Sequence, residues 1–139
     1  MLFFKYVTES FYDKSITSSF KKEKISESNI KKYIIDNPRL KHIRIQDSCF
    51  GYLISDEDNL VGAISVRNDI HCIQALEVFG EYKGKGISYY LLDIAVKELG
   101  AKSLTVRKTN EIAIHTYIKY GFKINKSKST DYMYWMDKR

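Results

Sequence analysis

The chain has 139 residues, of which 44% are hydrophobic and 29% charged, enough for one domain with a buried core. A net charge of +6 would suit a polyanionic partner, but the lysines are spread along the chain and no nucleic-acid-binding motif accompanies them. Two cysteines, Cys49 and Cys72, are too few for a disulfide framework or a cysteine-rich zinc site. No run reaches the length of a transmembrane helix. These features predict a cytoplasmic protein that binds neither nucleic acid nor membrane.

The N-terminal third has the weakest secondary-structure signals. Leu2 to Val7 is apolar and aromatic enough for a first strand, whereas Thr8 to Lys24 reads as either a helix or an ordered loop. Ser26 or Ser28 can cap the next helix, which Asn37-Pro38 should end. No functional motif occurs in residues 1–47.

From Ser48 the hydrophobic pattern becomes that of strands. Ser48 to Ile54 and Leu60 to Val66 flank a polar turn, which predicts a hairpin, and Ile70 to Phe79 follows as a third strand. The next segment, Gly86 to Leu99, has apolar residues four apart and predicts the first long helix. Lys102 to Arg107 is then a strand parallel to the third one, because a strand-helix-strand order favours parallel neighbours.

The C-terminal segment continues this alternation. Asn110 can cap a helix from Glu111 to Tyr120, and Gly121 can end it. Two closing strands follow, Phe122 to Asn125 and Tyr132 to Met136. The fold class expected is therefore α/β, more narrowly α+β: a single domain whose mixed, mostly antiparallel sheet is flanked by helices.

A basic, glycine-bearing turn lies between the third strand and the first long helix. Glycines let a backbone approach a ligand closely, and the free N–H groups at the start of a helix favour a bound phosphate. The turn predicts a pyrophosphate site, although an ordinary strand-to-helix turn would look the same. Its six residues are Lys83, Gly84, Lys85, Gly86, Ile87 and Ser88.

With its flanking motifs, this turn resembles the coenzyme A loop of the GNAT superfamily of N-acetyltransferases. The flanks are Leu76-x-Val78 before the turn, and Asn110-x-x-Ala113-x-x-x-Tyr117 and Tyr120-Gly121-Phe122 after it. Two positions depart from the family pattern, since Lys83 replaces Gln or Arg and Ser88 replaces Gly or Ala. The resemblance covers the C-terminal half of the chain.

The resemblance implies a sheet that splits between its two central parallel strands, with acetyl-coenzyme A as acyl donor and no metal. The backbone of Leu76 and Val78 would bind the pantetheine arm, and the turn from Lys83 to Ser88 the pyrophosphate. Asn110 would be a helix cap and also a cofactor contact. Residues 1–47 would form the acceptor side, and residues 48–139 the cofactor-binding core.

Two residues are candidates for catalysis. By resemblance Tyr117 is the general acid that protonates the departing thiolate, whereas an unrelated helix would simply bury such a tyrosine in its core. Some family members use a glutamate earlier on this strand as the base, but Cys72 occupies that position in this chain. Glu77 is then the nearest acidic candidate for a base or an acceptor-orienting group. A solvated strand residue is the alternative for Glu77.

The sequence thus predicts an enzyme that transfers an acetyl group from acetyl-coenzyme A directly to a primary amine. The acceptor would be a small molecule or a peptide, and a homodimer is possible. Two other functions stay open. One is a non-catalytic coenzyme A binding module, which would not need Tyr117; the other is a basic nucleic-acid-binding protein, which would not bind coenzyme A.

Overall fold

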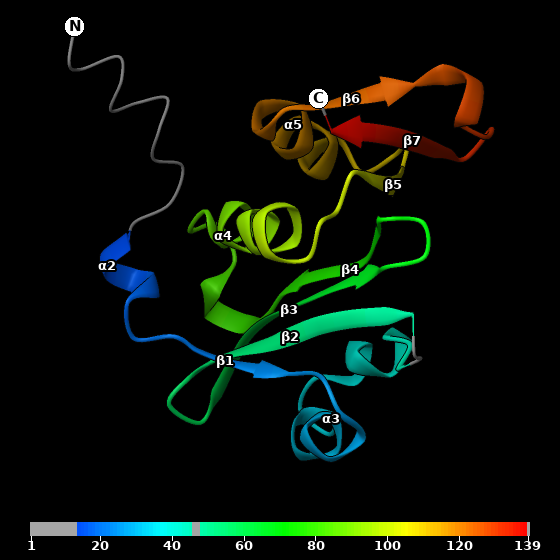
Figure 1. The fold of residues 1–139 in the computed structure, drawn as a ribbon. Helices are drawn as coiled ribbons and strands as arrows, with labels where there is room; N and C mark the ends of the chain where they lie inside the picture. Colours follow the sequence, from blue (N-terminus) through cyan, green and yellow to red (C-terminus); the bar gives the residue numbers. More distant parts are fainter. Residues whose placement is uncertain (1–13, 46–47, 139) are drawn as a thin grey trace, which may run out of the picture.

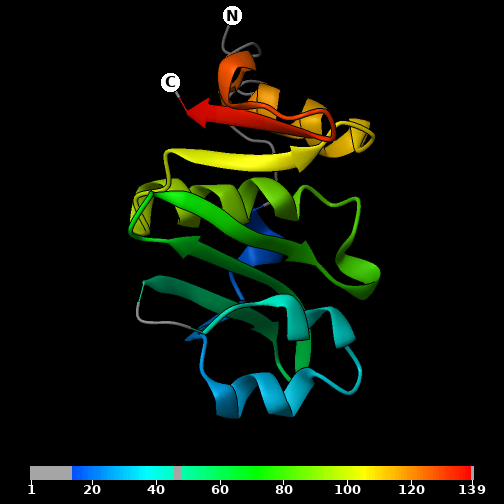
Figure 2. The ribbon, with the colours of Figure 1, turned by 90° about the vertical axis from the view of Figure 1, so that its right-hand side faces the viewer.

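The computed structural model describes residues 14–45 and 48–138, which contain a seven-stranded mixed sheet with helices on both faces (Figures 1 and 2). The strand order is β1-β2-β3-β4-β5-β7-β6. The strand expected at Leu2 to Val7 lies outside the described residues. In the described ranges no helix is both long and apolar enough to cross a membrane.

The N-terminal part of the described chain contains a strand that the sequence pattern did not predict. A short helix, α2 (Lys14–Thr17), is followed by β1 (Lys21–Lys24), which pairs antiparallel with β2. Ser26 then caps α3 (Glu27–Tyr33), as predicted, with its side chain accepting a hydrogen bond from the Asn29 amide at 3.2 Å. A 3-10 helix, η1 (Pro38–His42), completes this part.

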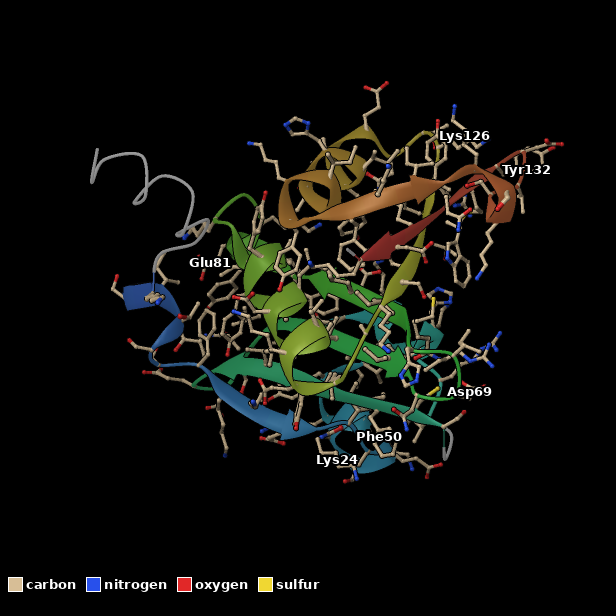
Figure 3. The ribbon with its side chains drawn as sticks, turned by 45° about the horizontal axis from the view of Figure 1, so that its top comes forward. Lys24, Phe50, Asp69, Glu81, Lys126 and Tyr132 are labelled. Carbon is tan, nitrogen blue, oxygen red and sulfur yellow. The ribbon has the colours of Figure 1, made fainter. Side chains whose placement is uncertain are left out.

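The predicted three-strand meander is confirmed. It consists of β2 (Cys49–Asp56), β3 (Asn59–Arg67) and β4 (Cys72–Val78), which pair antiparallel in sequence. The third strand starts two residues later than expected, after a turn at residues 68–71. In Figure 3, Lys24 and Phe50 lie together near the β1 edge of the sheet, and the Lys24 ammonium is 5.5 Å from the centroid of the Phe50 ring.

The C-terminal half follows the predicted alternation of helix and strand. Helix α4 (Ile87–Asp93) continues as one π-helical turn (Ile94–Glu98), and β5 (Ser103–Arg107) then runs parallel to β4. The remaining elements are α5 (Glu111–Tyr120), β6 (Phe122–Asn125), a 3-10 turn (Lys126–Lys128) and β7 (Met133–Lys138). Lys126 and Tyr132 mark this end of the sheet in Figure 3.

Two hydrophobic clusters hold the helices on opposite faces of the sheet. One contains Leu91 of α4 and partly buried residues of α5, packed on Ile64 of β3. The other contains Tyr33 of α3 and Leu40 of η1, packed against strand residues that include Ala63. Helices α4 and α5 therefore share one face, and α3 and η1 share the other.

The sheet splits between its two central parallel strands, as the family resemblance implies. Strands β4 and β5 share only two register pairs, Cys72 with Ser103 and Ile73 with Leu104. The next residue, Gln74, is the extra residue of a β-bulge, because Ser65 of β3 pairs with Ala75 while its neighbour pairs with Ile73. A bulge bends its strand, which accounts for β4 leaving β5 at this point.

Helix α4 should depend strongly on one leucine. Leu91 is fully buried in the cluster between α4 and the sheet. Leu91→Ala removes buried methyl groups and leaves a cavity, so we expect the free energy of unfolding to fall by about 2–5 kcal/mol. Urea denaturation followed by circular dichroism measures this loss. The partly buried Leu99 is the control, since Leu99→Ala should cost distinctly less.

Candidate active site

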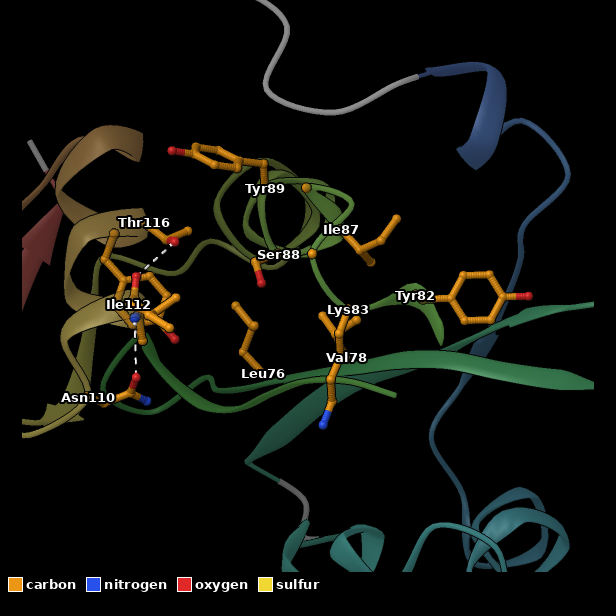
Figure 4. A pocket seen from close by; sticks show the side chains of 14 residues that line it. Leu76, Val78, Tyr82, Lys83, Ile87, Ser88, Tyr89, Asn110, Ile112 and Thr116 are labelled. Carbon is orange, nitrogen blue, oxygen red and sulfur yellow. Dashed lines mark hydrogen bonds between the residues drawn. The ribbon is translucent and has the colours of Figure 1, made fainter. Parts of the chain in front are cut away.

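A cleft of about 610 Å³ opens on the α4–α5 face, beside the point where β4 leaves β5 (Figure 4). Strand β4 forms its floor, and the start of α4 and the first turns of α5 form its walls. Nine of the predicted site residues line this one cleft: Leu76, Val78, Lys83, Gly84, Gly86, Ile87, Ser88, Asn110 and Tyr117. Segments that are distant in sequence therefore meet in a single site.

The turn before α4 has the geometry of an anion-binding loop. Gly84 and Gly86 both have φ of +78°, a left-handed conformation that side chains with a Cβ rarely adopt. Among the described residues, no hydrogen bond engages the amide groups of residues 84–88. Ser88 lies in the first turn of α4 and faces β4 in Figure 4. These free amides, together with the helix dipole, can hold a phosphate.

Strand β4 presents a free edge to the cleft. Beyond Ile73 its backbone has no partner in β5, while its other edge stays paired with β3. Leu76 and Val78 both line the cleft, so an extended ligand with amide groups can lie along this edge as an added strand would.

Helix α5 brings the candidate acid into the cleft. The Asn110 side chain caps the helix by accepting a hydrogen bond from the Ala113 amide at 3.2 Å. Tyr117 lies one turn beyond Ala113 on the same face, and both residues line the cleft. The ring of Tyr117 also packs edge-on against Phe122, with ring centroids 6.4 Å apart. The cap and this packing fix where the tyrosine hydroxyl points.

The environment of Tyr117 keeps its hydroxyl protonated. Burial, and to a smaller extent the negative charge of Glu77, together raise the pKa of Tyr117 to about 12. A phenol with this pKa is neutral at physiological pH and can serve only as a proton donor there.

We expect Tyr117 to ionise well above pH 10, the usual value for a tyrosine. Subtracting the absorbance titration of Tyr117→Phe from that of the wild type isolates one phenol, which should titrate near pH 12. Glu77→Gln should lower this pKa by removing the nearby charge. In the unfolded chain Tyr117 ionises near pH 10, whereas in the folded protein it stays neutral up to about pH 12. The contribution of Tyr117 to the free energy of unfolding is therefore fully present below pH 10 and is lost as the pH rises towards 12. A difference titration centred near pH 10 would contradict this environment.

Glu77 and Lys85 do not line the cleft. Glu77 pairs across the sheet with Ala63, which packs with η1, so its side chain points to the face opposite the cleft. There it accepts a hydrogen bond from Arg39, with Nε to Oε1 at 3.3 Å, and forms an ion pair with Nη2 at 3.2 Å. Its charge nevertheless reaches Tyr117 across the gap between β4 and β5.

Five cleft residues were not predicted as site residues: Tyr82, Tyr89, Ile112, Ala113 and Thr116, of which only Ala113 belongs to the motif that carried the resemblance. Ile112 is 85% exposed, an unusual position for an isoleucine, and it precedes the Ala113 of the motif by one residue. Thr116 lies one turn further and donates a hydrogen bond to the Ile112 carbonyl at 3.0 Å. The sequence did contain a signal for Ile112 and Thr116, because their helical spacing puts them beside Ala113 and Tyr117 on one face of α5. Tyr82 and Tyr89 gave none, because aromatic residues are frequent throughout the chain.

The cleft combines free backbone amides, an unpaired strand edge and one neutral phenol. In the described part of the chain no group of three or more His, Cys, Asp or Glu side chains is placed to hold a metal ion. These features suit a ligand that carries both phosphates and amides, with a leaving group that takes a proton from Tyr117.

Comparison with known proteins gives a family for the chain. The family model described as an acetyltransferase (GNAT) domain matches residues 11–133. A sequence search among curated proteins finds no match.

Several solved structures share the fold. The ribosomal-protein-S18-alanine N-acetyltransferase from Escherichia coli aligns with a TM-score of 0.70 at 15% identity, over 86% of this chain and 92% of its own. A dodecameric spermidine N-acetyltransferase from Vibrio cholerae aligns at 0.60, 15% identity and the same coverage. An N-acetyltransferase from Campylobacter jejuni in complex with acetyl coenzyme A aligns at 0.59 and 19% identity, over 84% of this chain and 96% of its own. At these identities the likeness shows the fold alone.

Proposed function

The chain belongs to the GNAT acetyltransferase family, and on that premise we propose that it transfers an acetyl group from acetyl-coenzyme A to a primary amine. The observation that carries the proposal is the cleft between β4, α4 and α5. It brings the glycine turn, the free strand edge and Tyr117 together.

The residues of the cleft fit the donor along its length. Amides of the turn at residues 84–88 are free to bind the pyrophosphate, and Lys83 and Lys85 add positive charge beside it. The unpaired edge of β4 at Leu76 and Val78 can bind the amides of the pantetheine arm. Asn110 stands at the start of α5, where its side chain caps the helix and lines the same cleft.

Tyr117 has the properties of the general acid in this reaction. Acetyl-coenzyme A, when bound, would supply an activated carbonyl carbon, to which the amine nitrogen would bond as the carbon–sulfur bond breaks. The proton that nitrogen loses would pass to solvent, and sulfur would gain one proton. Tyr117 stays neutral at physiological pH because its pKa is raised, and its hydroxyl donates the proton that sulfur gains. The phenol recovers its proton from solvent.

Glu77 is the group that receives or orients the acceptor amine. It lies between Leu76 and Val78 in sequence but faces η1, so it approaches the gap between β4 and β5 from the other side of the sheet. A carboxylate here attracts an ammonium group and can take its proton before attack. Donor and acceptor would thus meet in the gap from opposite faces.

Calorimetric titration with acetyl-coenzyme A tests the proposal. We expect one site per chain with a dissociation constant in the micromolar range, about −8 kcal/mol. A nucleic-acid oligomer, titrated in parallel at several salt concentrations, tests the basic nucleic-acid-binding alternative. Binding of the oligomer without binding of acetyl-coenzyme A would overturn the proposal. Donor binding without any acetyl transfer across an amine library would favour the non-catalytic module.

A further inference from the structure

The ion pair between Arg39 and Glu77 lies on the face of β4 opposite the cleft, the side from which the proposed function has the acceptor enter. Leu40, the residue after Arg39, is fully buried and packs in the cluster that holds η1 on the sheet. This packing places the Arg39 guanidinium over β4, where Nη2 lies 3.2 Å from the Glu77 carboxylate. The arginine side chain is 71% exposed and the glutamate side chain 30%. A ligand approaching from solvent therefore meets Arg39 before it meets Glu77.

The segment around Arg39 is basic. Between Asn37 and Ile45 it carries three permanent positive charges, on Arg39, Lys41 and Arg44, and no acidic residue. All three side chains are exposed. A surface cluster of one sign attracts ligands of the opposite charge and repels those of its own. The entrance therefore disfavours an acceptor that is cationic throughout, such as a polyamine.

An exposed ion pair is easily replaced by a ligand that offers both charges. Pairs of this kind contribute little to folding, so opening one costs little. An amine without an anionic group that binds the Glu77 carboxylate displaces Arg39. The Arg39 guanidinium then has no carboxylate partner in a segment whose other charges, on Lys41 and Arg44, are also positive. An amine that carries an anion can bind Glu77 through its ammonium group and Arg39 through its anion, so both charges stay paired.

We propose that the acceptor is a primary amine that also carries a carboxylate or a similar anionic group, with Arg39 binding the anion and Glu77 the ammonium. The inference rests on the proposed acetyltransferase function and specifies its substrate class. Arg39 is then a specificity-determining residue, and the basic segment of η1 draws the acceptor to the site.

Matched pairs of amines test the preference. Alaninamide has a neutral amide where alanine has a carboxylate, and putrescine has a second amine where γ-aminobutyrate has a carboxylate. Each of the four amines is incubated with the protein and acetyl-coenzyme A, and the release of the coenzyme A thiol is followed. For the wild type we expect kcat/KM for the carboxylate member of at least one pair to exceed its partner's about ten-fold. Arg39→Gln should abolish this ratio, and Arg39→Glu should invert it towards the cationic or neutral member.

Arg67 offers the matched control. It forms a comparable exposed ion pair with Asp69, with Nη2 to Oδ2 at 2.7 Å, at the far end of β3. Arg67→Gln likewise removes a guanidinium that is paired with a carboxylate. It should leave the kcat/KM ratio between the members of each amine pair unchanged. If both variants change the ratio equally, the preference reflects overall charge and the assignment to Arg39 fails.

The outcomes separate this inference from the proposed function. A wild type that prefers the neutral or cationic member of both pairs overturns the inference while supporting acetyl transfer. A protein that binds acetyl-coenzyme A but acetylates none of the four amines also overturns it as stated. Absence of acetyl-coenzyme A binding by calorimetry contradicts the proposed function itself.

Discussion

Tyr117→Phe should lower kcat by about two to four orders of magnitude, the range that general acids contribute. The change removes only the hydroxyl, and the ring can keep its packing against Phe122. The residues expected to hold the donor's phosphates and amides lie on β4 and at the start of α4, so the affinity for acetyl-coenzyme A should stay within a few-fold of the wild type. Steady-state kinetics and calorimetry, applied to the same protein preparation, measure the two quantities.

Tyr120 provides the control for this substitution. It belongs to the same helix, but its hydroxyl donates a hydrogen bond to Asp93 of α4 at 2.7 Å instead of lining the cleft. Tyr120→Phe should therefore cost stability, about 1–3 kcal/mol, and leave kcat nearly unchanged. Equal rates for Tyr117→Phe and the wild type would remove Tyr117 from the mechanism.

Ser88→Glu should abolish binding of acetyl-coenzyme A, raising its dissociation constant at least about a hundred-fold. The substitution puts a negative charge and a longer side chain where the free amides of the turn would hold a pyrophosphate. Ser88 is half-buried at the second position of α4, a site that tolerates an acidic residue as far as helix stability is concerned. Calorimetry measures the affinity, and circular dichroism shows whether the fold is retained.

Ser28 is the equivalent position in α3, again the second residue of a helix. Ser28→Glu adds the same charge to the same helical position on the other face of the sheet. It should leave the dissociation constant for acetyl-coenzyme A unchanged. Tight donor binding by Ser88→Glu would show that the turn does not hold the phosphates.

Local signals predicted the C-terminal half of the fold well. Asn110 caps α5 as expected, and Gly86 and Gly121 lie at the helix ends with positive φ angles. The order of β4, α4 and β5 fixed a parallel pair, because such connections have few alternatives. Residues within one turn or one cap were thus readable from the sequence alone.

Features that depend on distant contacts were not readable. The segment from Lys21 to Lys24 has the composition of a solvated loop, yet it forms β1 because β2 offers it a partner. Lys22 adds an ion pair with Glu98 and lies 4.8 Å from the centroid of the Tyr52 ring. The pattern of apolar and polar residues around Lys22 predicts neither of these contacts.

The same limit applies to the candidate site. The alternation of β4 puts Glu77 opposite Leu76 and Val78, but only the packing of η1 shows what its carboxylate meets. The bulge at Gln74 is likewise set by the pairing with β3 and not by the residue itself. Arg39 carried no motif, because its contact with Glu77 joins residues that are far apart in the sequence.

The narrow join between β4 and β5 also has a consequence for motion. With two register pairs across the middle of the sheet, the strands on either side are held together mainly by side chains of the cluster under α4 and α5. Regions with few backbone hydrogen bonds open before the rest of a protein unfolds, so amide hydrogen exchange should be faster along the facing edges of β4 and β5 than in β3, which is paired on both sides. A ligand lying in the gap would bridge the two halves and slow this exchange. Hydrogen exchange at residues 74–78 would then report occupancy of the cleft without any turnover.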